Sequence, residues 1–465
     1  MVASKDYFFC GIGGSGMLPL ACIVRAQGNR VAGSDRALDQ DRLGAKFDFL
    51  RGLGIDLFRQ DGSGLTRSEQ ILVTSAAIEE TVPDVVKARE LGAPRVTRPE
   101  LLAELFNAAP LGIAVGGTSG KSTVTGMIGW ILHALGRDPT VMNGAVMKNF
   151  ASAETAFASA LVGHGDAFVS EVDESDGSIA LYRPKVAVLN NVTLDHKSLD
   201  ELRHLFGDFA LKADKVVVNL DDDETRLLAA ALPADKLVGY SLNGADAVLA
   251  GSNVEEQPFA ISFDVADRSS GRSARVRLQV PGWHNAANAL AAIGAVTAAG
   301  IALEEAAEAL SGFAGLSRRF ELVGEGNGVT VIDDFGHNPD KIAATLQTLH
   351  AFPGRLLLFF QPHGYGPLRT MGRELIDTFV HELGDEDVLI LSDPAYFGGT
   401  TDRSVGSGDI ALGIVKSGKR AEHVGDREAA GERLVELARP GDRLVVMGAR
   451  DDTLSQFARA LLAKL

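Results

Sequence analysis

Short apolar runs alternate with longer amphipathic runs along almost the whole chain. The short runs are rich in Val, Ile, Leu and Phe, as buried parallel strands are, and the longer runs carry apolar residues at helical spacing. Strands are predicted at residues 6–10, 30–33, 71–75, 111–115, 167–172, 186–192, 215–219, 329–332, 355–360, 387–391 and 443–447. Helices are predicted at residues 17–26, 85–91, 99–107, 124–135, 340–350, 372–382 and 427–437, with an alanine-rich helix that opens near residue 282. This alternation predicts an α/β fold with mostly parallel sheets.

The chain is too long for a single hydrophobic core. At 465 residues it should form two or three domains of about 100–200 residues each. Three successive series of strands and helices place the predicted boundaries near residues 107 and 315. The expected domains are therefore residues 1–107, 108–314 and 315–465.

Composition narrows the range of partners. The net charge of −16 and the pI of about 5.1 disfavour a nucleic acid partner, because an acidic surface repels a phosphate backbone. Cys10 and Cys22 lack the spacing of metal ligands, so they are interpreted as buried free thiols of a reducing compartment. The N-terminus leads straight into a strand, and residues 286–303 are too weakly apolar to span a bilayer. We expect a cytoplasmic protein without membrane insertion.

A glycine-rich turn joins the first predicted strand to the first predicted helix. Residues 11–16 read Gly-Ile-Gly-Gly-Ser-Gly, which allows a tight turn and brings backbone amides against a phosphate at the helix N-terminus. Asp35 follows the second strand, where an acidic residue commonly meets a ribose hydroxyl. The turn fits NAD, FAD or a UDP-sugar, and a purely structural turn is the alternative.

A second glycine-rich turn has the character of a phosphate-binding loop. Residues 116–123 read Gly-Gly-Thr-Ser-Gly-Lys-Ser-Thr between a strand and an apolar helix, although the loop is shorter than the common form. Loop amides would surround the phosphates of ATP, Lys121 would neutralise them, and the Ser122 hydroxyl would face Mg²⁺. ATP and Mg²⁺ are therefore the expected cofactors.

Further candidate ligands follow the next strands of this unit. Four carboxylates lie within residues 171–176, and Glu171 is interpreted as a magnesium ligand, with a solvated loop as the alternative. His196 follows another strand and is expected in the same site, with a purely structural histidine as the alternative. Asn285 and Asn288 lie at the start of the alanine-rich helix; Asn285 is either a helix cap or a site residue, and the Asn288 amide could recognise an adenine edge.

In the third unit, polar residues gather after the predicted strands. They occupy residues 333–339, 361–365 and 393–403. Ligands of open parallel sheets bind beyond the carboxyl ends of the strands, which predicts a further part of the site at these loops.

Taken together and in this order, these motifs resemble those of the Mur ligases along nearly the whole chain. Within that family the sequence is most similar to the ligases that join L-alanine to UDP-N-acetylmuramate. The matching segments are residues 11–17, 33–35, 117–123, 171–176, 282–288, 318–320, 333–339 and 360–363.

The resemblance implies three domains: a Rossmann-like UDP-binding domain, a central P-loop ATPase domain and a C-terminal Rossmann-like domain that brings the amine. It also implies an acyl-phosphate intermediate in the synthesis of a peptidoglycan precursor. The implied catalytic residues are Lys121, Glu171, His196 and His363, with Ser122, Glu171 and His196 at the metal. The implied nucleotide contacts are Gly117, Thr118, Ser119, Gly120, Lys121, Ser122, Thr123, Asn285, Asn288, Arg318, Asp334 and His337. The implied substrate contacts are Gly13, Gly14, Ser15, Gly16, Asp35, Ser75 and Arg369.

The departures from the family pattern concentrate in the third unit. The L-alanine ligases typically continue their Phe-Gln-Pro-His motif with Arg-Tyr-Thr-Arg-Thr-Arg, whereas residues 364–369 here read Gly-Tyr-Gly-Pro-Leu-Arg. Only Arg369 keeps its place among arginines suited to the carboxylate of an amino acid. The expected partners are UDP-N-acetylmuramate and an amino acid or peptide, and L-alanine is the expected amino acid. The protein is expected to be a monomer or a homodimer. A murein tripeptide ligase is one alternative, and a UDP-sugar and ATP sensor without ligase activity is another.

Overall fold

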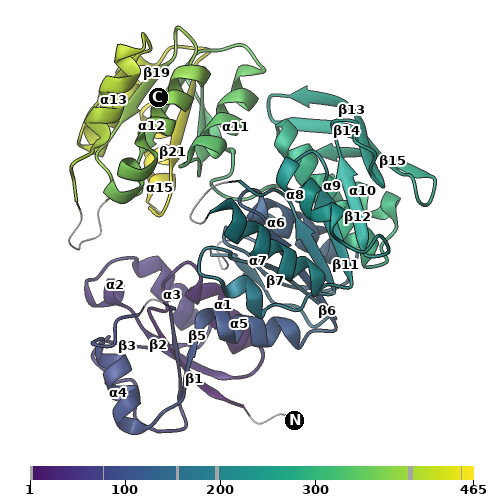
Figure 1. Ribbon diagram of the computed structural model, residues 1–465. Coiled ribbons are helices and arrows are strands. Elements are labelled where there is room, and N and C mark those ends of the chain that lie inside the picture. The colour runs from purple at the N-terminus through teal and green to yellow at the C-terminus, as the bar shows by residue number, and fades with distance from the viewer. Residues whose placement is uncertain are drawn as a thin grey trace. The chain divides into compact units, whose positions relative to one another are not determined.

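The computed structural model describes residues 4–76, 78–152, 155, 157–193, 198–395, 402–451 and 453–465. The chain forms two compact units. The first comprises Met1–Val254, Ser262–Leu278 and Ala286–Gly315, and the second comprises Glu255–Ile261, Gln279–Asn285 and Leu316–Leu465. The first unit contains a five-stranded sheet and most of a ten-stranded sheet, and the second contains a six-stranded sheet (Figure 1).

The first sheet is wholly parallel and has the strand order β3-β2-β1-β4-β5. Its strands are β1 (Asp6–Cys10), β2 (Arg30–Ser34), β3 (Asp56–Phe58), β4 (Ile71–Thr74) and β5 (Arg95–Thr97). Its helices are α1 (Met17–Ala26), α2 (Arg36–Asp39), α3 (Gly44–Gly52), α4 (Pro83–Leu91) and α5 (Arg98–Asn107). Successive β1 residues point to opposite faces, so Phe9 packs with α1, α3 and α5 while Phe8 packs with α4.

The second sheet has the order β15-β14-β13-β12-β11-β10-β6-β9-β7-β8. Its strands are β6 (Leu111–Gly116), β7 (Thr140–Met142), β8 (Ala160–Leu161), β9 (Ala167–Glu171), β10 (Val186–Leu189), β11 (Lys215–Asn219), β12 (Leu237–Ser241), β13 (Leu249–Gln257), β14 (Ala260–Asp267) and β15 (Arg272–Leu278). The helices are α6 (Lys121–Ala134), η1 (Ser178–Leu181), α7 (Leu199–Leu211), α8 (Asp223–Ala230), α9 (Trp283–Ala298) and α10 (Leu303–Leu310). Phe206 of α7 lies against β6, and Gly294 of α9 lies against Val217 of β11, so helices cover the parallel part of the sheet.

The third sheet has the order β16-β17-β21-β18-β19-β20 and is parallel apart from the edge strand β16. Its strands are β16 (Glu321–Gly326), β17 (Val329–Asp334), β18 (Leu356–Gln361), β19 (Val388–Leu391), β20 (Ala421–His423) and β21 (Arg443–Gly448). Helices α11 (Pro339–His350), α12 (Tyr365–Glu382) and α13 (Ser407–Lys416) cover one face, and α14 (Arg427–Leu437) and α15 (Leu454–Lys464) cover the other (Figure 1). The predicted α/β fold with three sheets is confirmed.

Several predicted elements differ from the structure at their ends, and two of these differences bear on the site. The strand predicted to reach residue 192 ends at Leu189, since the two asparagines that follow turn their side chains to the phosphate loop. The helix predicted from residue 372 begins at Tyr365, so residues 365–369 are the first part of α12 rather than a loop, and Gly364 is the N-cap. The boundary predicted at residue 107 falls between α5 and β6, and the one predicted at residue 315 falls between α10 and β16.

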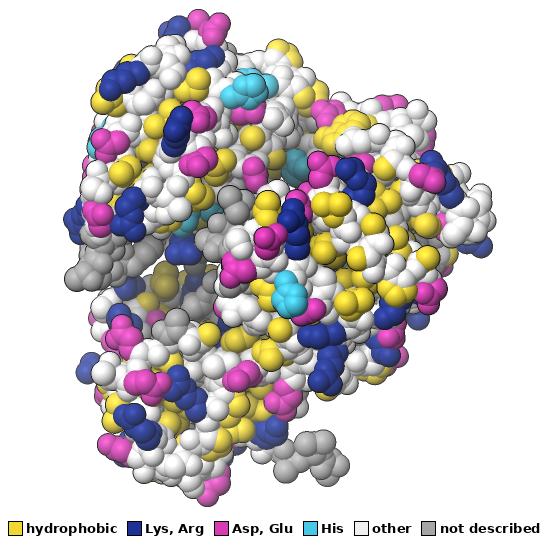
Figure 2. Space-filling view, viewed as in Figure 1, with side chains coloured by type: hydrophobic (Ala, Val, Ile, Leu, Met, Phe, Trp, Pro, Cys, Tyr) yellow, Lys and Arg dark blue, Asp and Glu magenta, His cyan; other side chains and the backbone are white. Residues whose placement is uncertain are grey.

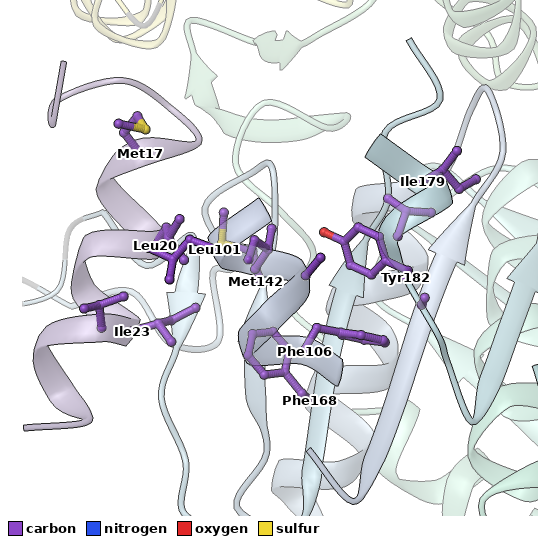
Figure 3. Close-up of a cluster of buried hydrophobic side chains, with 14 of the residues drawn as sticks. Met17, Leu20, Ile23, Leu101, Phe106, Met142, Phe168, Ile179 and Tyr182 are labelled. Atoms are coloured by element: carbon purple, nitrogen blue, oxygen red, sulfur yellow. The ribbon is translucent and has the colours of Figure 1, made fainter. Parts of the chain in front are cut away.

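A layer of apolar side chains packs the first sheet against the second within the first compact unit. Helices α1 and α5 contribute Met17, Leu20, Ile23, Leu101 and Phe106, and the second sheet and η1 contribute Met142, Phe168 and Ile179, with Tyr182 just beyond η1 (Figure 3). The Phe106 ring stands edge-on to Phe168 and to Tyr182, at centroid distances of 5.7 and 5.1 Å. This layer fixes the glycine-rich turn of the first sheet relative to the phosphate loop of the second.

The surface is mixed in charge. On the face shown in Figure 2, Lys and Arg side chains are interspersed with Asp and Glu. Within the residues that the structure describes, no helix combines the length and apolar character required to cross a bilayer.

We predict that Phe106→Ala lowers the free energy of unfolding by about 3–5 kcal/mol, because the fully buried ring packs from α5 against Phe168 of the second sheet and against Tyr182. Denaturant titration followed by circular dichroism measures the change. Leu211→Ala, at an α7 side chain that is 53% exposed, is the matched control and should change stability by less than about 1 kcal/mol. Equal losses in the two variants would show that the layer does not stabilise the unit.

Candidate active site

The phosphate loop connects β6 to α6 through two glycines with left-handed backbone angles. Gly117 has φ +132° and Gly120 has φ +82°, and α6 begins directly after Gly120, at Lys121. A Cβ on Gly120 would lie 2.3 Å from Asn190 Nδ2 and 2.6 Å from Asn288 Oδ1. Glycine is therefore required at residue 120 both by the backbone angle and by the close approach of two amides.

Two asparagines at the end of β10 hold this loop. The Asn191 side chain accepts hydrogen bonds from Ser119 N at 2.8 Å and from Thr118 Oγ1 at 2.9 Å. Its Nδ2 and the Nδ2 of Asn190 both donate to the Ser119 carbonyl, at 3.1 and 3.0 Å. Because β10 pairs with β6, these amides lie directly beside the loop and fix its conformation.

Lys121 is held at the start of α6 by three oxygen atoms. Its Nζ donates to the Gly117 carbonyl at 2.5 Å and to Glu174 Oε1 and Oε2 at 3.0 and 2.8 Å. The side chains of Lys121 and Glu174 are 20% and 8% exposed. The ammonium thus lies where the phosphates of a nucleotide are expected to bind, at a helix N-terminus.

Ser122 and Glu171 form a second pair beside this lysine. Ser122 Oγ donates to Glu171 Oε2 at 2.9 Å. Glu171 Oε1 lies against Gly144, where a Cβ would approach it to 2.1 Å, so the absence of a side chain at residue 144 makes room for the carboxylate. A hydroxyl and a carboxylate at a phosphate loop are hard oxygen donors of the kind that Mg²⁺ prefers. In the described part of the chain, no three His, Cys, Asp or Glu residues converge as a metal cluster.

Asn288 also reaches the phosphate loop. Its Oδ1 accepts from Asn190 Nδ2 at 3.0 Å, and Asn190 Oδ1 accepts from the buried Tyr240 hydroxyl at 2.6 Å. Burial holds the pKa of Tyr240 well above its usual value, so the hydroxyl keeps its proton. The predicted adenine contact of Asn288 stays a prediction. The Asn285 amide donates to the Pro281 carbonyl at 2.6 Å and so helps fix the start of α9.

The predicted UDP-sugar residues meet at the carboxyl ends of adjoining strands of the first sheet. The turn that contains Gly13, Gly14, Ser15 and Gly16 follows β1, Asp35 follows β2, and Ser75 follows β4. Asp35 Oδ2 accepts from Gly13 N at 2.8 Å, and its Oδ1 accepts from Ala37 N at 2.8 Å. Asp35 therefore shapes the glycine-rich turn, and its predicted ribose contact stays a prediction.

Arg98 joins this glycine-rich turn to the acidic loop of the second sheet. A Cβ on Gly16 would lie 3.1 Å from Arg98 Cδ, and Arg98 NH2 lies 3.7 Å from Asp176 Oδ2. The turn expected to bind the sugar nucleotide and the loop that carries Glu174 are thus neighbours within the first compact unit.

In the second compact unit, Asp334 is an organising residue at the end of β17. Its carboxylate accepts from Phe320 N at 2.8 Å, from Gly336 N at 2.6 Å and from Thr345 Oγ1 at 3.2 Å. These bonds hold the loop that follows β17 in one conformation.

Arg318 is buried in the same region. Its guanidinium lies 3.4 Å from Asp333 Oδ1 and donates to the carbonyls of Gly448 and Asp451 at 2.7 and 3.0 Å. It therefore ties the end of β21 to β17, while its predicted nucleotide contact, like that of Asp334, stays a prediction.

His337 and His363 face each other at the ends of β17 and β18. Their rings are nearly perpendicular, with centroids 4.9 Å apart. Burial, with the positive charges of Lys341 and Arg319 nearby, lowers the pKa of His337 to about 3. The His337 imidazole is thus neutral near pH 7, and its Nδ1 lies 2.8 Å from the Phe335 carbonyl.

The segment that departs from the family pattern lies at the N-terminus of α12. Arg369 is exposed there and pairs with Asp402 at 3.2 Å. The Arg403 guanidinium lies over the Tyr365 ring, 5.3 Å from its centroid. Arg403 thus places a positive charge beside the start of α12. This is the segment in which the sequence lacks two arginines of the family pattern.

The site described by the structure differs from the predicted site at one predicted residue and at several residues that were not predicted. His196 lies outside the described residues. The sequence alone did not single out Asn190, Asn191, Tyr240, Gly144 or the Lys121 partner Glu174. Adjacent asparagines at the end of a strand beside the phosphate loop are the signal that could have identified Asn190 and Asn191.

Comparison with known proteins agrees with this arrangement. Residues 6–109, 115–296 and 318–450 match, respectively, the Mur ligase family catalytic domain, the Mur ligase middle domain and the Mur ligase glutamate ligase domain. A UDP-N-acetylmuramate–L-alanine ligase of Cereibacter sphaeroides is 35% identical over 469 residues, which span 98% of this chain and 96% of that protein. The chain belongs to the Mur ligase family. This Mur ligase is an ATP-dependent acid–amino-acid ligase.

Two solved structures share the fold of this Mur ligase. A UDP-N-acetylmuramate–alanine ligase from Thermotoga maritima superposes with a TM-score of 0.79 at 24% identity, covering 99% of this chain and 98% of that chain. A murein peptide ligase from Psychrobacter arcticus gives a TM-score of 0.71 at 24% identity, with the same coverage of each chain.

We predict that Gly120→Ala weakens ATP binding about tenfold or more, because a methyl group would collide with Asn190 and Asn288 and strain the left-handed backbone. Isothermal titration calorimetry with a non-hydrolysable ATP analogue measures the affinity. Gly136→Ala is the control, since Gly136 at the end of α6 has φ +70° but open space around it. Equal loss of affinity in the two variants would contradict a role for the amide contacts.

Proposed function

We propose that this Mur ligase joins L-alanine to the lactyl carboxylate of UDP-N-acetylmuramate, with cleavage of ATP to ADP and phosphate. The observation that carries the proposal is the convergence of Lys121, Ser122 and Glu171 at the phosphate loop, in a chain aligned from end to end with an L-alanine ligase. ATP and a nucleotide sugar are cytoplasmic metabolites, which supports the predicted cytoplasmic location.

The chemistry requires activation of the carboxylate, because a free carboxylate is a poor acyl donor. A carboxylate oxygen attacks the γ-phosphorus of ATP, the bond to the β–γ bridging oxygen breaks, and ADP leaves. The amine nitrogen then attacks the acyl carbon, the carbon–oxygen bond to the phosphoryl group breaks, and phosphate leaves as the nitrogen loses its proton. Lys121 stabilises the negative charge that develops on the transferred phosphoryl group.

The residues of the phosphate loop fit Mg²⁺. Ser122 and Glu171 would hold the ion, and His196 would help to hold a second one. When bound, Mg²⁺ offsets charge on the phosphate oxygens during phosphoryl transfer. The loop amides orient the phosphates, and Asn190 and Asn191 keep those amides in place.

The amine-binding residues are expected in the second compact unit. Arg369 and Arg403 carry positive charge near the start of α12, and a guanidinium suits the carboxylate of an amino acid. His363 is proposed to lie near the acyl phosphate or the amine, with the neutral His337 beside it.

A murein tripeptide ligase is the second candidate. The altered segment 364–369 is the observation that favours it. The two candidates share the UDP-sugar and differ in the amine, so they share every step that precedes attack by the amine.

We predict that purified protein releases phosphate from ATP only when UDP-N-acetylmuramate, Mg²⁺ and a suitable amine are all present. A coupled phosphate assay measures the rate with L-alanine, glycine, L-serine and the murein tripeptide, and L-alanine should give the highest kcat/KM. UDP-N-acetylglucosamine, which lacks the lactyl carboxylate, is the control and should give no release. Hydrolysis that ignores the UDP-sugar would contradict the ligase, and preference for the tripeptide would establish the second candidate.

We predict that Lys121→Ala lowers turnover about 100-fold or more, because the phosphoryl charge loses its fixed counter-charge. UDP-N-acetylmuramate should still bind with nearly unchanged affinity, since its expected contacts lie in the first sheet. Calorimetric titration of the variant with the UDP-sugar provides that measurement. Loss of UDP-sugar binding together with turnover would undo the assignment of the two substrates to different sheets.

A further inference from the structure

Glu174 engages Lys121 more completely than a surface ion pair does. Both carboxylate oxygens lie within 3.0 Å of the Lys121 ammonium, and the Gly117 carbonyl lies 2.5 Å from it. An ammonium has three hydrogens to donate, and three protein oxygens accept here. A phosphate oxygen that approaches Lys121 therefore competes with these acceptors for its hydrogens.

The carboxylate is the acceptor that can withdraw. The Gly117 carbonyl belongs to the loop that Asn191 and Asn190 hold in place, so it is fixed. Glu174 carries a negative charge of its own, and phosphates that arrive at the helix N-terminus repel it. Its buried position, with only 8% of the side chain exposed, increases that repulsion because little water screens it.

The loop around Glu174 is anchored on both sides. Asp173 Oδ1 accepts from Ser175 N at 2.8 Å and from Ser175 Oγ at 2.6 Å. Asp176 accepts from Ser178 N at 2.8 Å and pairs with Arg98. The backbone at Glu174 is therefore held, and a rotation of the Glu174 side chain is enough to free Lys121.

We propose that Glu174 is a positioning residue that occupies the phosphate site of the ATP-free enzyme and keeps the Lys121 ammonium in place. When ATP binds, its phosphates replace the Glu174 carboxylate as the partner of Lys121. The proposal rests on the proposed ATP site. ATP binding then includes the opening of the Lys121–Glu174 pair, which lowers the apparent affinity by the fraction of enzyme in which the pair is open. The same pair keeps the Lys121 side chain directed at the site before the nucleotide arrives.

The test compares Glu174→Gln with the wild type by calorimetric titration with a non-hydrolysable ATP analogue and Mg²⁺, without UDP-sugar. Glutamine keeps the size of the side chain and removes its charge, so the variant should bind the analogue about three- to tenfold more tightly. Steady-state kinetics should show a lower KM for ATP with no increase in kcat. Unchanged or weaker binding by Glu174→Gln would overturn the proposal.

Asp173→Asn is the matched control, because it removes the same charge from the same loop at a carboxylate bonded to Ser175 instead of Lys121. It should alter the affinity less than twofold, and an equal gain would show that general loop charge, not the pair, sets the affinity. In a Lys121→Ala background, Glu174→Gln should gain less than twofold. A full gain there would show that Glu174 acts on the phosphates directly and would overturn the positioning role.

Two outcomes separate this proposal from the proposed function. If the wild-type protein does not bind the ATP analogue, the ATP site itself fails. If the wild type binds and Glu174→Gln does not gain affinity, only the role of Glu174 fails. Circular dichroism checks that the variants are folded, and Glu174→Ala, which should change the affinity in the same direction, replaces Glu174→Gln if the latter does not fold.

Discussion

The phosphate loop depends on the hydrogen bonds that Asn190 and Asn191 make with its backbone. A loop with two left-handed glycines has many alternative conformations, and glycine loses more conformational entropy on folding than other residues. The side-chain amides of Asn190 and Asn191 select one of these conformations, because together they hydrogen-bond to both the N–H and the carbonyl of Ser119. Lys121, Ser122 and the first turn of α6 follow directly from that loop, so their positions depend on the same bonds.

The parallel pairing of β10 with β6 is what brings these amides to the loop. The sequence predicted both strands and their parallel arrangement, and it also predicted the loop, Lys121, Ser122 and Glu171. It could not show which side chains fill the space beside a loop, because that depends on register between strands more than seventy residues apart along the chain. Glu174 was visible as one of four nearby carboxylates, but only the fold distinguishes it from Asp173, which bonds to its own loop.

The third sheet shows a second limit of sequence patterns. Four of its six strands and its mostly parallel order were predicted correctly, whereas β16 and β20 were not predicted and the start of α12 was predicted seven residues too late. Gly364, Gly366 and Pro367 are typical of turns, and they obscure a helix that begins at Tyr365. Proline is compatible with the first turn of a helix, where the backbone N–H groups have no helical partner. Arg369 is therefore a helical residue, and it pairs with Asp402 from the first part of α12.

The expected sites of both reactants of the first proposed step, the sugar carboxylate and ATP, lie largely in the first compact unit. The glycine-rich turn and the phosphate loop belong to one unit, where the apolar layer around Phe106 holds their sheets together (Figure 3). Phosphoryl transfer needs the sugar carboxylate and ATP in one fixed geometry, since misalignment of reacting atoms sharply reduces the rate. In the proposed mechanism the amine attacks only after the acyl phosphate has formed, and the residues expected to bind it lie in the other unit. The first compact unit thus joins the two glycine-rich turns expected to bind the sugar nucleotide and the ATP phosphates, and the second carries the residues expected to bind the amine, along with the predicted nucleotide contacts Arg318, Asp334 and His337.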